Sequence, residues 1–428
     1  MTELQKSIPQ IVDDSSDERA DSILRIALDI GEGLLKSGGE IRRVETTIEK
    51  ICFAYGAAHV EVFSIQSLIV ASIRLPDGGY SSQNRRIANV QNHMLCLEAF
   101  NALSRKICAT CPDIGEVDKE IQAIKKKRRY PLFASLLGCV LASGGFAVIF
   151  GGSLMDALAT SLIGLVIGFL DNSEIFVFNK LAKTLFLSFI SGMLTCLTVI
   201  AGVGQHMDII AIGTIMLLVP GLSLGNAMRD LLCGDTLTGT LKTVQACITA
   251  IMIATGYALA ILLLGRFCAV YPPFAPAIPI SVVLKLIGSV AGTVGFALMF
   301  KSSWSRLWIT GLGGLITYAI YELAIFFGSA PLVAALLSAL FMHMAAEICA
   351  KLFRAPAILF FLCFAIPIVP GGSLYYAMSN MLSGNNAAAV YYLGNTGQIL
   401  LGMVLGICLS SVLLGIIEKI FAVVKKIK

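Results

Sequence analysis

One stretch of this sequence returns 150 residues later. VPGLSLGNAMRDLLCGD begins at Val219, and VPGGSLYYAMSNMLSGN begins at Val369. The same offset aligns Gly144–Ser153 with Val294–Ser303 without a gap. In each copy an apolar segment ends at Pro-Gly, where proline removes a backbone donor and glycine relaxes the backbone, so a helix is expected to break there. The sequence therefore predicts two related halves, each with a broken helix at the same place.

Charge separates an N-terminal part from the rest. Hydrophobic residues make up 57% of the sequence and charged residues 14%, against about 25% charged in an ordinary soluble domain. Residues 1–130 contain 36 of the 59 charged residues. This part is predicted to be soluble and the remainder to lie in a membrane. The basic runs Lys125–Arg129 and Lys425–Lys428 flank the membrane part, so we interpret them as topology signals, and no nucleic-acid partner is expected.

The N-terminal part is predicted to be a disordered tail, 1–20, followed by a cytoplasmic α+β domain with a basic linker helix, 21–130. Helices are expected over Asp21–Ser37, Ile41–Tyr55, Arg85–Ile107 and Gly115–Arg129, and strands over His59–Ile65 and Leu68–Leu75. The domain has no HExxH, GxSxG or P-loop motif. The pair Cys108 and Cys111 has no second CxxC nearby. No enzymatic activity, cofactor or metal is therefore expected.

The membrane part is predicted to form about ten transmembrane helices, five in each half. The segments are 131–150, 154–170, 182–203, 207–220 and 238–265 in the first repeat, 131–265, and 279–300, 304–323, 330–351, 355–370 and 391–420 in the second, 279–428. The fourth segment of each half is shorter than the roughly 20 residues that cross a bilayer and ends at Pro-Gly. Paired short segments of this kind are typical of the discontinuous helices of secondary transporters.

Five segments per half is an odd number, so the second half should enter the membrane from the opposite side. With the N-terminal domain in the cytoplasm, basic residues of both halves fall on cytoplasmic loops: Lys180, Lys183, Arg229, Lys242, Lys301, Arg306, Lys351 and Arg354. Only Arg266 falls in an outer loop, and Lys285 lies near an outer end. This bias follows the positive-inside rule. The sequence therefore predicts a 5+5 inverted repeat with both termini in the cytoplasm.

Two stretches resemble a known family. SGGEIRRVETTIEKICFAYG, Ser37–Gly56, is similar to the N-terminal domain of the threonine/serine exporter family, and VPGLSLGNAMRDLLCGDTLTG, Val219–Gly239, is similar to its Pro-Gly motif. In other members the two halves are separate proteins, and one such pair is linked to dicarboxylate export. The resemblance implies proton-driven export of small polar amino acids across a bacterial inner membrane.

The candidate substrate site lies at the two Pro-Gly breaks. Asn226, Arg229 and Asp230 follow the first break at helical spacing and can share one face. A helix start offers free N–H groups to a carboxylate, and Asp230 could receive an ammonium group or a proton. In the second copy Asn380 stands at the position of Asp230. The predicted substrate-binding residues are Pro220, Gly221, Ser223, Asn226, Arg229, Asp230, Pro370, Gly371, Ser373, Tyr376 and Asn380.

Ionisable groups within apolar segments are candidates for proton coupling. The candidates are Asp230, Asp171, His343 and Glu347. Each has a structural alternative: Asp230 as an interfacial pair with Arg229, Asp171 as a helix cap, and, for His343 and Glu347, a structural pair of Glu347 with Lys351. Three further carboxylates, Asp156, Asp208 and Glu322, are expected to be solvated at loop edges.

The sequence thus predicts a secondary active exporter of small polar amino acids. A passive facilitator or a dicarboxylate exporter of the same fold remains open, as does a membrane-anchored hydrolase acting through the N-terminal domain. The expected partners are the amino acid, protons and the lipid bilayer, with further copies of the chain as an open alternative.

Overall fold

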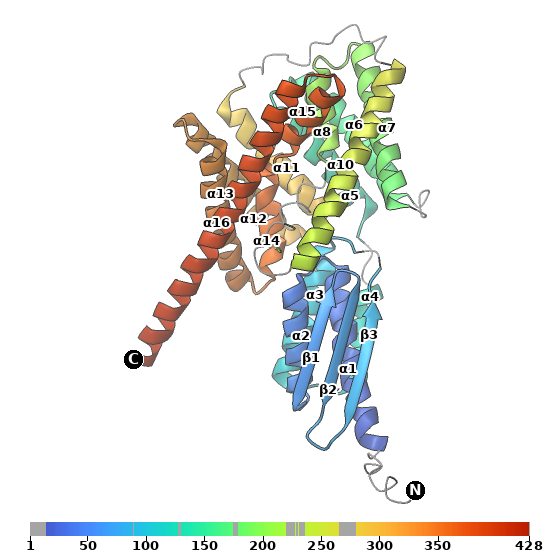
Figure 1. The fold of residues 1–428 in the computed structure, drawn as a ribbon, viewed down its shortest axis with the longest axis vertical. Helices are drawn as coiled ribbons and strands as arrows, with labels where there is room; N and C mark the ends of the chain where they lie inside the picture. The colour runs from blue at the N-terminus through green and yellow to red at the C-terminus, as the bar shows by residue number, and fades with distance from the viewer. Residues whose placement is uncertain are drawn as a thin grey trace, which may run out of the picture. The chain divides into compact units, whose positions relative to one another are not determined.

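The computed structural model describes residues 14–88, 90–126, 130–173, 179–219, 227, 230, 236–264 and 280–427. The chain divides into two compact units, Met1–Arg129 and Tyr130–Lys428 (Figure 1).

The first unit is a three-stranded sheet with helices on one face (Figure 1). Its elements are α1 (Asp14–Lys36), α2 (Ile41–Ala54), β1 (His59–Ile65), β2 (Leu68–Arg74), β3 (Tyr80–Arg86), α3 (Met94–Thr110) and α4 (Ile114–Lys126). The strands are antiparallel in the order β1-β2-β3. On β2, Ile69, Ala71 and Ile73 are buried while their neighbours are more exposed. This alternation of period two is what one face packed against helices requires.

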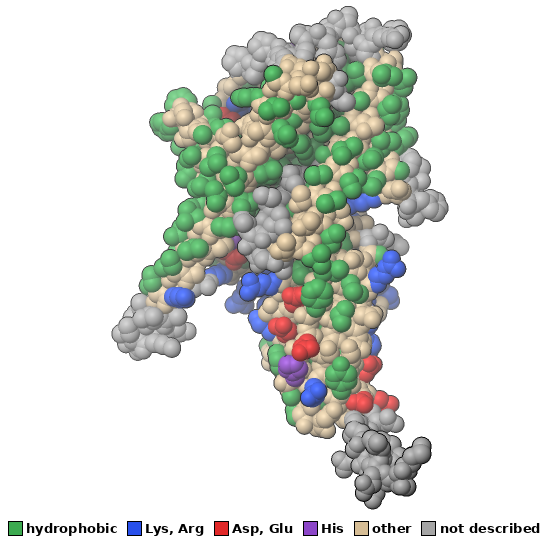
Figure 2. Space-filling model, viewed as in Figure 1, with side chains coloured by type: hydrophobic (Ala, Val, Ile, Leu, Met, Phe, Trp, Pro, Cys, Tyr) green, Lys and Arg blue, Asp and Glu red, His purple; other side chains and the backbone are tan. Residues whose placement is uncertain are grey.

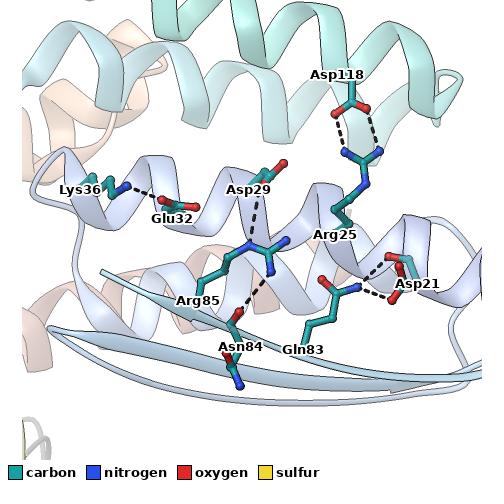
Figure 3. Close-up of polar contacts among 9 residues, drawn as sticks. All are labelled: Asp21, Arg25, Asp29, Glu32, Lys36, Gln83, Asn84, Arg85 and Asp118. Atoms are coloured by element: carbon teal, nitrogen blue, oxygen red, sulfur yellow. Dashed lines mark hydrogen bonds and ion pairs between the residues drawn. The ribbon is translucent and has the colours of Figure 1, made fainter. Parts of the chain in front are cut away.

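Helix α1 forms the centre of this unit. Ile23, Leu24, Ala27 and Ile30 are almost completely buried, and a helix with so wide an apolar stripe must contact several elements at once. Polar contacts along the length of α1 connect it to α4 and β3. Figure 3 shows them: the Arg25 guanidinium donates to Asp118 of α4 at 2.7 and 3.2 Å, Arg85 of β3 lies 3.6 Å from Asp29, and Gln83 of β3 donates to Asp21 at 2.7 Å.

Two expectations for this unit were wrong. Helix α1 begins at Asp14, so residues 14–20 are helical and not a disordered tail. The segment Tyr80–Arg86 is a strand, and the helix expected from Arg85 begins at Met94. The strand sequence YSSQNRR has no apolar alternation, so its conformation is set by pairing with β2 and by the hydrogen bond from Ser81 to Asp21.

The second unit is helical. Its elements are α5 (Leu132–Ile149), α6 (Leu154–Asn172), α7 (Lys180–Ile200), α8 (Met207–Ile215), α10 (Thr236–Leu264), α11 (Val282–Met299), η2 (Trp304–Arg306), α12 (Leu307–Phe326), α13 (Pro331–Phe353), α14 (Ala357–Ala365), η3 (Ile366–Ile368), α15 (Gly371–Leu382) and α16 (Asn386–Ile427).

Within the described ranges, eight of these helices are long and apolar enough to cross a membrane, or nine if the bent pair α14–η3 and α15 is one crossing. The fourth of the ten expected crossings, 207–220, contains α8 and ends at Pro220, which lies outside the described residues. On the face drawn in Figure 2, many hydrophobic side chains are exposed on the helices of this unit and charged side chains are sparse there. The protein is a multi-pass membrane protein.

The 150-residue offset reappears in the helix boundaries. Helices α5 and α11 both start and end 150 residues apart, and so do α8 and α14. A Cβ on Gly138 would lie 2.7 Å from the carbonyl oxygen of Gly295, and a Cβ on Gly145 would lie 2.7 Å from that of Gly288. Contacts at higher residue numbers on α5 involve lower residue numbers on α11, so the two helices are antiparallel. Gly138 is equivalent to Gly288 and Gly145 to Gly295, so exchanging the halves converts one contact into the other.

Candidate functional site

The second Pro-Gly pair bends a transmembrane segment. Helix α14 passes into η3, which contains Pro367, and Val369 is extended with φ −62° and ψ 127°. Pro370 then caps α15, which begins at Gly371. The axes on the two sides of this break differ by 47°. Since neither Pro367 nor Pro370 has a backbone N–H, the α-helical hydrogen-bond ladder cannot run through this stretch.

The first Pro-Gly pair is described only up to its edge. Helix α8 ends at Ile215, turns follow, and Val219 is the last residue before the gap. Asp230 is helical beyond it. Five of the predicted substrate-binding residues lie outside the described residues: Pro220, Gly221, Ser223, Asn226 and Arg229.

The segment that leads to the first Pro-Gly pair meets the second break inside the helical unit. A Cβ added to Gly371 would lie 2.3 Å from the Met216 sulfur and 3.6 Å from a Val219 methyl group. Met216, Ile366 and Tyr375 belong to one buried cluster that also draws on α5, α10, α11 and α12. Because Gly371 has no side chain, the start of α15 can approach the residues that follow α8 closely.

The described lining of this junction is apolar. A cleft between α8, α10 and α15 is too narrow to admit a water molecule. It is lined by Ile215, Val219, Ala250, Ile253, Leu374, Tyr375 and Met378. In this conformation the described side chains close the space between the breaks.

Polar groups of the second break lie beside this junction. Ser373 donates to the carbonyl of Pro370 at 3.2 Å and accepts from Thr396 of α16 at 3.0 Å. Tyr376 donates to Asp208 in the first turn of α8 at 3.2 Å, and its ring stacks on that of Tyr392. The break of the second half is thereby connected to the first half by a hydrogen bond.

Asn380 has an unusual environment. Its side-chain nitrogen donates to the carbonyl of Tyr376 at 2.8 Å, and the residue is fully buried. Its Oδ1 atom has no hydrogen-bond partner among the described residues. A buried acceptor without a partner costs about 1–3 kcal/mol, so this oxygen is a polar group at which a donor would be stabilising.

Asp230 is paired with a different cation from the one expected. Lys242 Nζ on α10 donates to Asp230 Oδ2 at 2.6 Å, and the Asp230 side chain is 13% exposed. Arg229, the expected partner, lies outside the described residues. By the 150-residue offset, Lys242 corresponds to Tyr392, as Asp230 corresponds to Asn380. The first half therefore has an ion pair where the second half has neutral polar side chains.

The other proton-coupling candidates lie on different helix pairs. Asp171 is 57% exposed and pairs with Lys183 at 2.9 Å, between the end of α6 and the start of α7. His343 Nδ1 on α13 lies 2.9 Å from Ser410 Oγ on α16. Glu347 is half-buried, one turn further along α13. The structure therefore does not gather these groups at the junction of the breaks.

Two carboxylates that were expected to be solvated have structural partners. Asp156 is completely buried and accepts hydrogen bonds from the backbone N–H groups of Gln205 and His206 and from Ser153. The His206 ring nitrogen lies 2.8 Å from the same carboxylate. Asp208 accepts from Tyr376. The spacing Ser-x-x-Asp at Ser153 could have indicated the first of these, because it is a capping box.

A third carboxylate, Glu322 on α12, was also expected to be solvated and is instead part of a cluster within the helices. Both of its oxygens lie 3.2 Å from Lys285 Nζ on α11, and Tyr318 donates to one of them at 2.6 Å. The rule that an ionisable group in an apolar segment is a functional candidate could have found it.

Comparisons with known proteins identify the family of this chain. Residues 25–264 match the ThrE model of threonine/serine exporters, and residues 285–413 match a second model, described as Threonine/Serine exporter, ThrE. The threonine/serine exporter of Corynebacterium glutamicum is 24% identical over 407 residues, which cover 90% of this chain and 81% of that protein. No solved structure matches. Because the first model alone covers more than half of the chain, this multi-pass membrane protein belongs to the threonine/serine exporter family.

Proposed function

We propose that this protein is a secondary active exporter of threonine, serine or similar small polar amino acids, driven by protons across a bacterial inner membrane. Family membership supports amino-acid export. The observation that carries the proposal is that the second Pro-Gly break meets the segment leading to the first, where Gly371 lies against Met216 and Val219. Neither half alone could form this junction, and a site at the interface of two repeats is typical of transporters.

The proposed topology is an inverted repeat with both termini in the cytoplasm. The antiparallel crossing of α5 and α11 supports it, because the glycine contacts are exchanged when the halves are exchanged. A two-fold axis that relates antiparallel helices lies perpendicular to them, and therefore in the plane of the membrane. In this arrangement residues 21–130 form a cytoplasmic domain whose role is in docking and not in catalysis.

The proposed substrate site uses both breaks. The start of α15 at Gly371 would receive the substrate carboxylate, because N–H groups of a first helical turn lack intrahelical acceptors. Asp230 would receive the substrate ammonium. It already holds one ammonium group, that of Lys242, at 2.6 Å, so substrate binding would exchange one cation for another. Ser223, Asn226 and Arg229 of the first break, with Ser373, Tyr376 and Asn380 of the second, would complete the site.

The direct test is efflux of labelled threonine and serine from proteoliposomes, with and without a pH gradient. We expect efflux that the gradient accelerates and that dicarboxylates do not inhibit. Efflux that ignores the gradient would identify a passive facilitator, and preference for a dicarboxylate would contradict the assignment of substrate.

Asp230→Asn tests the site within the same assay. Loss of a hydrogen bond to a charged group costs about 1.5–3 kcal/mol, so the concentration of amino acid at half-maximal efflux should rise about tenfold or more. Folding should be retained, because asparagine occupies the equivalent position at Asn380. Unchanged half-saturation at equal protein level would exclude Asp230 from substrate binding.

A further inference from the structure

The cluster around Glu322 has the features of a reversible charge site. Its carboxylate lies 3.2 Å from Lys285 Nζ through both oxygens and accepts a 2.6 Å hydrogen bond from Tyr318. The Glu322 side chain is 20% exposed and the Lys285 side chain 29% exposed. Most of the surface of both side chains is therefore buried, but part of each side chain remains accessible. A group that gains and loses a proton requires such access.

The fold itself does not need this pair. At the equivalent positions of the first half stand Ser135 for Lys285 and Asn172 for Glu322, and helices α5 and α6 pack together there with neutral residues at both positions. Ionisable groups within membrane segments are costly and are retained for function or for pairing. Because the first half folds with neutral residues at these positions, stability alone does not account for the charges in the second half.

The cluster is also connected to the junction of the breaks. Tyr318 is buried in the same side-chain cluster as Met216, Ile366 and Tyr375, and Tyr321 packs against that cluster. The rings of Tyr318 and Tyr321 are stacked. Through Tyr318, Glu322 is therefore in direct contact with the side-chain cluster that contains Met216 and Ile366.

Three other described carboxylates of this unit, Asp156, Asp171 and Asp230, are less suited to carrying a proton. Asp156 is fixed by hydrogen bonds from Ser153 and from two backbone N–H groups. Asp171 is mostly exposed, and its charge is therefore solvated. Asp230 is paired with Lys242 and is assigned above to the substrate.

We propose that Glu322 is the group that carries the transported proton, an inference that rests on the proposed function. In the unloaded state the carboxylate is paired with Lys285 and Tyr318. Binding of a proton to a carboxylate oxygen forms a neutral carboxyl group and removes the attraction to Lys285, so α11 and α12 can shift relative to one another. Loss of that proton to the other side of the membrane restores the pair.

Lys285 is the cation that faces Glu322 across the α11–α12 contact in the described residues. The titratable groups of the elements packed on α12 are otherwise His343, Glu347, Cys349 and Lys351 of α13, Cys363 of α14 and Arg306 of η2. Those of α13 lie in its second half, whereas Glu322 lies near the end of α12 that leads directly into the start of α13. The groups that contact the Glu322 carboxylate are therefore Lys285 and Tyr318.

The test separates coupling to the proton gradient from movement of the amino acid across the membrane. In proteoliposomes, Glu322→Gln should lower gradient-driven threonine or serine efflux at least tenfold, while exchange of labelled for unlabelled amino acid at equal pH stays within about twofold of the wild type. The double variant Lys285→Ser with Glu322→Asn, which installs the residues of the first half, should behave in the same way and remain monodisperse. Gradient-driven efflux at the wild-type level in either variant would overturn the proposal, as would loss of exchange in both.

A second measurement does not depend on transport. Infrared difference spectra recorded across a pH step should contain a carbonyl band from a protonated carboxyl group, and Glu322→Gln should remove it. A wild-type spectrum without that band, or a band unchanged in the variant, refutes the proposal. If the band behaves as expected while the wild-type protein moves no amino acid, the proposed function fails and the protonation of Glu322 stands.

Discussion

Replacing Gly145 by alanine tests the central helix crossing. The added Cβ would lie 2.6 Å from the Gly292 nitrogen and 2.7 Å from the Gly288 carbonyl oxygen. Both atoms belong to the backbone, so a change of side-chain rotamer cannot relieve the clash. To restore an ordinary contact of 3.4 Å or more, α5 and α11 must separate by about 0.8 Å at this point. A gap of that size removes about a quarter to a half of the dispersion energy of the contacts that it opens, and overpacking costs about 1–3 kcal/mol.

The repeat makes a second prediction from the same geometry. Gly295 is equivalent to Gly145, and its Cβ would lie 2.4 Å from the Ala142 nitrogen and 2.7 Å from the Gly138 carbonyl oxygen. Gly295→Ala should therefore cost a similar 1–3 kcal/mol or so. The double variant should cost less than the sum, because helices that have separated at one contact are already further apart at the other.

The matched control is Gly397→Ala on α16, where an added Cβ meets nothing within 4 Å. It should be neutral, or stabilising by about 0.5–1 kcal/mol through helix propensity. The free energy of unfolding would be measured by reversible denaturation in mixed micelles for all four variants. If Gly145→Ala and Gly295→Ala are as stable as Gly397→Ala, the close crossing is refuted, and a large difference between the two would contradict the two-fold relation of the halves.

Three further predictions concern topology, a buried thiol and the first unit. Single cysteines at Thr236 and Ser383, in a background without native cysteines, should be labelled from opposite sides of the membrane, and labelling from the same side would contradict the inverted repeat. Burial raises the pKa of the Cys52 thiol to about 12, so its contribution to stability is complete below the unfolded value near 9 and is lost as pH rises from there towards 12. Mass spectrometry should then find Cys52 alkylated at pH 9 only after denaturation, whereas alkylation of the folded protein would show that it is not buried. Purified protein should hydrolyse neither peptides nor esters, since the Glu45 carboxylate is engaged by the Ser64 N–H at 2.7 Å, and hydrolysis abolished by Glu45→Gln would revive the hydrolase alternative.

The positions of the transmembrane helices could be read from the sequence. Segments predicted at 131–150 and 279–300 are α5 and α11, which begin at Leu132 and Val282. In a membrane the backbone must satisfy its own hydrogen bonds, so a long apolar segment has little choice but to be a helix. The break at Pro370 was predictable for a similar reason, because proline prevents the ladder from continuing through local covalent chemistry alone.

The strand Tyr80–Arg86 shows where local sequence was insufficient. Its residues are polar and do not alternate, and a hydrogen bond to Asp21, about 60 positions earlier, helps to hold it. The strand forms because the edge of β2 offers unpaired backbone groups, and this edge exists only once the sheet has assembled.

The partners of the charged groups were likewise decided by tertiary structure. Local spacing suggested Arg229 as the partner of Asp230, but packing of α10 brings Lys242 to that carboxylate. Glu322 finds its cation 37 positions away on α11. A charge within a membrane segment is evident in the sequence, because its transfer cost depends only on the residue and its apolar surroundings. Its partner depends on which helix faces lie within a few ångströms of one another, and only the packed helices fix that distance.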